Sequence, residues 1–66
     1  MLRWQDTYPI VFALEDQYPT IDILGIRFTD LRQWILDLEN FDDHPDGCNE
    51  KILEAIQMAW LDERAS

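Results

Sequence analysis

The residues best able to do chemistry are seven carboxylates between Asp37 and Glu54. They are Asp37, Glu39, Asp42, Asp43, Asp46, Glu50 and Glu54. Hard cations prefer such oxygen ligands, and Fe²⁺ accepts them. The order of residues lacks the pattern of an EF-hand loop, so we expect any metal site here to be shallow, weak and partly hydrated. The alternative interpretation is a solvated acidic surface that only docks on a basic partner or keeps the domain in solution.

Two softer ligands, His44 and Cys48, lie among these acids. A closed zinc site needs four ligands, commonly with two or more cysteines, and these two residues fall short. We therefore expect a turn histidine and a half-buried thiol near a helix start. The surrounding acids should raise the pKa of the thiol, so it is not proposed as a nucleophile. With no catalytic residues identified, we do not expect an enzyme.

Charge is the most informative bulk property. The chain has a net charge of −9, and residues 37–66 hold nine of its fourteen acids. Such a field repels nucleic acid, whose binding depends on Lys and Arg at phosphates, and it attracts cations and basic proteins. A DNA-binding domain is allowed by the helices predicted below, but they carry too few bases for it.

Sixty-six residues indicate one domain, spanning residues 1–66. Cys48 is the single cysteine, so no internal disulfide forms, and a reducing compartment is expected. No apolar run is long enough to span a membrane, and the first ten residues do not resemble a signal peptide. We expect a cytoplasmic monomer.

Three helices must position these residues. The first begins after Asp6 and ends before Pro19. A short extended segment follows at residues 26–28, and Thr29 is expected to cap the second helix. After a turn-rich loop, Asn49 or Cys48 opens the third helix. Three helices with one or two short extended segments indicate a mainly α, helix-turn-helix or winged-helix-like domain.

Apolar residues at helical spacing predict the core. We expect one cluster to contain Leu14, Ile35, Leu38, Ile52, Ile56 and Trp60. Trp4 precedes the first helix, and core packing and a surface contact with a partner are equally favoured for it. An internal salt bridge is favoured for Arg27 and Arg32.

Two segments make the sequence recognisable. "RFTDLRQWILDLENFDD" at residues 27–43 and "NEKILEAIQMAWLDE" at residues 49–63 resemble the IscX family of iron–sulfur cluster assembly proteins. Trp4 and the Tyr18-Pro19 pair also fit, and the resemblance covers almost the whole chain. The departures are local: "HPDGC" replaces an expected acid and small polar residues, "IDILGIRF" lacks a proline, and the first helix is unusually apolar.

The resemblance implies a small modified winged-helix fold and a non-enzymatic regulator of cluster assembly. It also implies weak iron binding at acidic surface residues, as Fe²⁺ or Fe³⁺, and docking on a bacterial cysteine desulfurase in competition with frataxin. The expected partner-binding residues are Trp4, Asp37, Glu39, Asp42, Asp43, Asp62 and Glu63. An acidic interaction adaptor with no metal role is the alternative.

Overall fold

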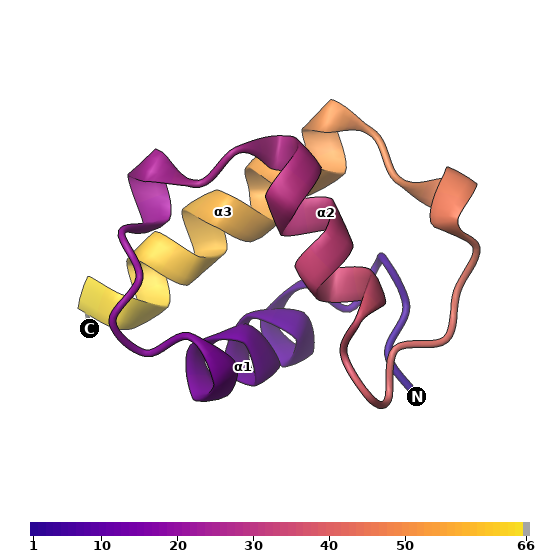
Figure 1. Ribbon diagram of the computed structural model, residues 1–66, viewed down its shortest axis with the longest axis horizontal. Coiled ribbons are helices and arrows are strands. Elements are labelled where there is room, and N and C mark those ends of the chain that lie inside the picture. Colours follow the sequence, from indigo (N-terminus) through magenta and orange to yellow (C-terminus); the bar gives the residue numbers. More distant parts are fainter. Residues whose placement is uncertain (66) are drawn as a thin grey trace.

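The structure, a computed structural model, describes residues 1–65 and is built from three α-helices (Figure 1). The helices are α1 (Thr7–Gln17), α2 (Phe28–Leu36) and α3 (Glu50–Ala65), with two single-turn 3₁₀ helices, η1 (Ile23–Gly25) and η2 (Pro45–Gly47). α3 is the longest helix, and both α1 and α2 pack against it. The predicted mainly α class and the three helices are confirmed.

The boundaries of α1 follow the predicted signals. Asp6 is the N-cap, and Pro9 lies within the first turn, where its missing N–H leaves no helical hydrogen bond unmade. The Asp6 carboxylate accepts the N–H of Arg3 at 2.9 Å and makes no side-chain bond to the helix itself. The helix ends at Gln17, before Tyr18 and Pro19.

The start of α2 differs from the prediction. Arg27, in an extended conformation, is the N-cap, and its carbonyl accepts the N–H of Leu31 at 2.9 Å. Thr29 therefore lies inside the first turn, and its expected role as a cap is wrong. Phe28 packs against the core from the first helical position, and this packing favours an earlier start than the capping signal indicates. The extended segment is correspondingly short, comprising Ile26 and Arg27.

Asn49, rather than Cys48, caps α3. Its side-chain Oδ1 accepts the N–H of Ile52 at 2.9 Å, and its carbonyl accepts the N–H of Leu53 at 3.1 Å. These bonds satisfy N–H groups that have no partner within the helix. Asn49 thereby fixes where the acidic loop ends and α3 begins.

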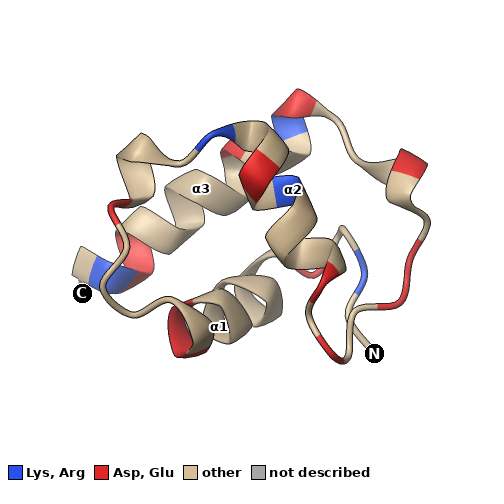
Figure 2. Ribbon diagram, in the orientation of Figure 1, with Lys and Arg blue, Asp and Glu red and all other residues tan. Residues whose placement is uncertain are grey.

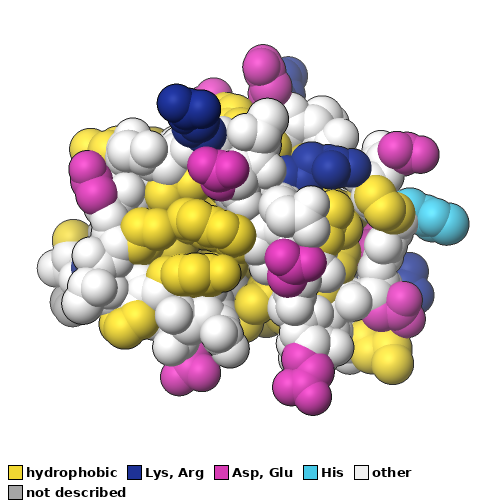
Figure 3. Space-filling view, in the orientation of Figure 1, with side chains coloured by type: hydrophobic (Ala, Val, Ile, Leu, Met, Phe, Trp, Pro, Cys, Tyr) yellow, Lys and Arg dark blue, Asp and Glu magenta, His cyan; other side chains and the backbone are white. Residues whose placement is uncertain are grey.

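One hydrophobic core lies between the helices. Of the six residues predicted to form it, Leu14, Ile35, Leu38, Ile56 and Trp60 are buried together, and Ile52 is half-buried against them. On the face shown in Figure 3, hydrophobic side chains gather in the centre and most acidic side chains lie toward the margins. Tyr18 and Trp34 stack at the edge of the core, with ring centroids 4.5 Å apart.

The N-terminal segment pairs with the loop that follows α2. Leu2 and Phe41 form an isolated parallel β-bridge. The N–H of Leu2 donates to the carbonyl of Asn40, and the N–H of Asp42 donates to the carbonyl of Leu2, both at 2.8 Å. The two segments lie at the opposite end of the molecule from the C-terminus (Figure 1). No β-strand occurs within residues 1–65, so the winged-helix assignment is not confirmed.

Candidate functional site

Trp4 holds the acidic loop in place. Its side chain is only 3% exposed, and its indole Nε1–H donates to the carbonyl of His44 at 2.7 Å. The ring meets Phe41 edge-on, with centroids 4.7 Å apart. A Cβ at Gly47 would lie 3.0 Å from the Trp4 ring, so a side chain there would crowd the indole. Of the two roles expected for Trp4, core packing is the one observed, and its assignment as a partner-binding residue is withdrawn because its surface is covered.

Asp43 is also part of the scaffold. Its Oδ1 accepts the N–H of His44 at 2.8 Å, and its Oδ2 accepts the N–H of Trp4 at 3.2 Å. These two hydrogen bonds hold the pKa of the Asp43 carboxyl below its usual value, and the bond from His44 has the larger effect. The charge of Arg3 makes a smaller contribution. Asp43, which the sequence predicts to bind a metal and a partner, is thus an ionised structural residue that joins the loop to the N-terminal segment.

The remaining loop acids point toward solvent. Asp37, at the end of α2, accepts a hydrogen bond from the Gln33 amide at 3.0 Å, and it stays exposed. Glu39, Asp42 and Asp46 are exposed as well. Figure 2 shows these acidic positions distributed along the loop. We call the surface formed by Asp37, Glu39, Asp42 and Asp46 the acidic loop surface.

The seven predicted ligands do not form a metal centre. Within residues 1–65, no three His, Cys, Asp or Glu side chains come together in an arrangement that could hold an ion. Glu50 and Glu54 are exposed on α3. Because like charges repel and exposed carboxylates are well hydrated, such side chains spread apart unless an ion or a scaffold gathers them.

The predicted partner-binding acids fall into two groups. Asp62 and Glu63 belong to the C-terminal part of α3, which lies at the far end of the molecule from the acidic loop (Figure 2). Asp62 is exposed, whereas Glu63 is half-buried. Most of the length of α3 therefore separates Asp62 and Glu63 from the loop.

The pKa of the Cys48 thiol is raised, as the sequence predicts, but the cause differs from the predicted one. The thiol is half-buried, and burial raises its pKa, with a smaller opposing effect from the charge of Arg32. The neighbouring acids are not the cause. A raised pKa leaves little thiolate at neutral pH, which agrees with the expectation that this cysteine is not a nucleophile.

The two arginines of the central region make no ion pair within the part of the chain described. Arg32 instead donates from Nη2 to the carbonyl of Pro45 at 3.1 Å, and thereby links α2 to η2. Arg27 is exposed at the start of α2. The predicted internal salt bridges of Arg27 and Arg32 are therefore wrong.

An ion pair between Glu15 and Arg64 was missed by sequence reasoning. The two side chains form a two-bonded pair, at 2.7 and 3.0 Å, and Glu15 also accepts the indole N–H of Trp60 at 2.9 Å. Arg64 donates in addition to the carbonyls of Tyr18 and Ile21. These contacts lower the pKa of Glu15 and raise that of Arg64, in each case mainly through the hydrogen bond between them.

Only one partner of this ion pair, Arg64, had a recognisable signal in the sequence. Arg64 is the base of the last turn of α3, where a cation suits the helix dipole. Its partner lies 49 residues earlier, and no local pattern connects them. The contact fastens the C-terminal turn of α3 to α1 and to the segment that follows it.

Fold and site together define a class of protein: small, acidic and helical, with carboxylates presented separately on a braced loop. A family model described as "Iron-sulphur cluster assembly" matches residues 2–65, and the chain belongs to this family, the IscX family. An uncharacterized protein of Pseudomonas aeruginosa is 43% identical over 63 residues, which cover 96% of each chain. The resemblance stated from the sequence is confirmed.

Among the described helices, none combines the length and the apolar character needed to cross a membrane.

Proposed function

We propose that this protein is a non-enzymatic regulator of iron–sulfur cluster assembly that docks its acidic loop surface on a basic surface of a cysteine desulfurase in the bacterial cytoplasm. The observation that carries the proposal is the presentation of exposed Glu39, Asp42 and Asp46 on a loop braced by Trp4 and Asp43. Membership of the family supports the process in which the protein acts. The identity of the partner comes from the resemblance.

The bracing has an energetic consequence for docking. A loop already held in one conformation loses less entropy on binding than a free one, so more of the interaction energy contributes to affinity. Two hydrogen bonds of Trp4 tie the loop to the N-terminal segment: its backbone N–H donates to Asp43 at 3.2 Å, and its indole N–H donates to the carbonyl of His44 at 2.7 Å. A third bond, from the N–H of His44 to Asp43 at 2.8 Å, lies within the loop and shapes it. The exposed acids are therefore offered in a fixed arrangement to complementary Lys and Arg residues.

Weak iron binding is the second part of the proposal. The chemistry of the donors suits iron, because carboxylate oxygens are acceptable ligands for Fe²⁺ and good ones for Fe³⁺. Their arrangement within residues 1–65 supplies no set of three. Iron would thus contact one or two carboxylates at a time and keep most of its water. The same arrangement is consistent with the alternative, an acidic adaptor whose carboxylates bind only the partner protein and no metal.

A binding experiment with frataxin as competitor tests the docking proposal. Purified desulfurase is titrated with the protein at low and at high salt. The double variant Glu39→Gln/Asp42→Asn should bind more weakly at low salt, because it removes two charges of the acidic loop surface. The matched control, Asp22→Asn/Asp30→Asn, loses the same charge at exposed positions outside the loop and should bind like the parent.

Frataxin should displace the protein from the desulfurase in the same experiment. The docking proposal fails if the protein does not bind desulfurase at all, or if the two double variants lose affinity equally. In the second case net charge, and not the acidic loop surface, would govern binding.

A further inference from the structure

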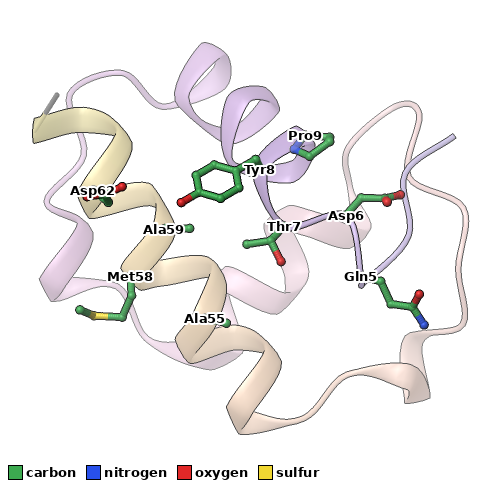
Figure 4. Close-up of a pocket in the computed structure, with 9 residues that line it drawn as sticks. All are labelled: Gln5, Asp6, Thr7, Tyr8, Pro9, Ala55, Met58, Ala59 and Asp62. Atoms are coloured by element: carbon green, nitrogen blue, oxygen red, sulfur yellow. The ribbon is translucent and has the colours of Figure 1, made fainter.

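A second surface of the molecule lies between the N-terminal part of α1 and the middle of α3, away from the acidic loop surface. We call it the α1–α3 groove, and Figure 4 shows the residues that line it. They are Gln5, Asp6, Thr7, Tyr8, Pro9, Ala55, Met58, Ala59 and Asp62. The ring of Tyr8 extends from the first turn of α1 toward α3, where Ala55 and Ala59 present only small side chains (Figure 4).

Large apolar side chains are exposed along this groove. Tyr8 is 46% exposed and Met58 is 56% exposed, and both line it. Phe12, 53% exposed, continues the row along α1, with its ring centroid 6.3 Å from that of Tyr8. Isolated exposed hydrophobic residues are ordinary, but two that line one groove, with a third beside them, are typical of an interaction site.

The charge around the groove indicates what kind of partner it suits. Its charged lining residues are Asp6 and Asp62, and no Lys or Arg lines it within the described chain. Asp16 and Arg64 line the neighbouring depression beside Phe12, where the guanidinium is already paired with Glu15. Lys51 lines another depression, which shares Gln5, Thr7 and Ala55 with the groove. The charges on the groove itself are the two carboxylates, beside small apolar side chains of α3.

We propose that the α1–α3 groove binds a basic amphipathic segment of the desulfurase, with an apolar side chain between Tyr8 and Met58 and a Lys or Arg beside Asp62. The inference rests on the proposed function, since it adds a second contact to the same complex. A second copy of this chain is a poor occupant, because two proteins of charge −9 repel each other. An anionic membrane surface is disfavoured for the same reason.

Single variants in the groove test the inference. Tyr8→Ser and Met58→Ser each remove an exposed apolar side chain, and each should weaken binding to the desulfurase by roughly tenfold, the effect of losing a central interface contact. The loss should appear mainly as faster dissociation, whereas removal of acids at a rim slows association. Leu24→Ser is the matched control, because Leu24 is 70% exposed in η1 and lies outside the groove.

Amide spectra of the labelled protein give a second readout. On addition of unlabelled desulfurase, signals of residues 5–9 and 55–62 should shift or broaden together with those of the acidic loop. If Tyr8→Ser and Met58→Ser bind like the parent while Glu39→Gln/Asp42→Asn binds more weakly, the groove inference is overturned and the proposed function stands. If the parent protein does not bind desulfurase, both are overturned.

Discussion

The backbone N–H of Trp4 donates a hydrogen bond to the carboxylate of Asp43, 39 residues later in the chain, at 3.2 Å. The bond joins the N-terminal segment to the loop that carries the exposed acids. The same carboxylate accepts the N–H of His44, and the Trp4 indole donates to the carbonyl of that residue. Adjacent acids at positions 42 and 43 thus have different roles, since Asp43 shapes the loop and Asp42 faces solvent.

The different roles of these two neighbours can be separated by substitution. Asp43→Asn should lower the melting temperature, because an amide nitrogen would replace one of the two oxygens that now accept backbone N–H groups. Asp42→Asn, the matched control, should melt like the parent. Thermal unfolding followed by circular dichroism measures both. Equal melting temperatures for the two variants would show that the Asp43 hydrogen bonds contribute nothing to the fold.

Stability should depend on pH through the same carboxyl. The pKa values of Asp43 and Glu15 are lower in the folded protein than in the unfolded chain, so both groups stabilise the fold fully above the ordinary carboxyl pKa of about 4. That contribution is lost as pH falls through the lower, folded-state values. The free energy of unfolding should therefore decrease in acid, and it should decrease less in Asp43→Asn. Urea titrations at several pH values measure this, and identical pH dependence in parent and variant would contradict it.

Trp60 is the largest of the fully buried side chains. It is fully buried and its indole N–H is bound to Glu15, so Trp60→Ala should cost about 3–5 kcal/mol of unfolding free energy. A domain typically has a total stability of only about 5–15 kcal/mol, so the variant should be partly unfolded or close to it. Met58→Ala, on an exposed face of the same helix, should change stability by no more than about 0.5 kcal/mol. If Trp60→Ala unfolds at the same urea concentration as the parent, α3 does not pack as described.

Iron binding, if it is localised, should be visible at the loop. Iron or a trivalent surrogate should shift or broaden amide signals of residues 37–46, with Glu50 and Glu54 as secondary positions. Affinity should be weak, because no three ligands are gathered in advance within residues 1–65. Asp42→Asn should reduce the effect without altering the fold. An equal response around Asp62, at the other end of the molecule, would mean that the acids hold only a diffuse cloud of counter-ions.

Local sequence signals predicted the helices and most of the core correctly. Pro19 ends α1, Asn49 caps α3, and the helical spacing of Ile56 and Trp60 identifies the buried face of α3. The capping signal at Thr29 gave a wrong prediction, because α2 begins one residue before it, at Phe28, which packs against the core. The local pattern measures a preference of about 1 kcal/mol, which tertiary contacts readily outweigh.

The site was harder to predict because its contacts are distant in the sequence. No pattern around Asp43 indicates that its carboxylate binds the backbone of Trp4, and none around Glu15 indicates Arg64. The α1–α3 groove does have a signal in the sequence. Tyr8 and Phe12 are four residues apart and out of phase with the buried Ile10 and Leu14, so α1 has more apolar surface than its own core face requires.

We propose that exposed acids of a braced loop steer this protein to a basic desulfurase surface. The most direct test is the association rate of the two proteins at increasing salt, because the Debye length shrinks to about 8 Å at physiological ionic strength and attraction at longer range is lost. The rate should be high at low salt and fall steeply, and charge steering can contribute about 10- to 1,000-fold. Glu39→Gln/Asp42→Asn should associate more slowly and with a shallower dependence on salt, while its dissociation rate stays close to that of the parent. An association rate that does not change with salt would mean that the acidic loop surface does not steer the protein to the desulfurase.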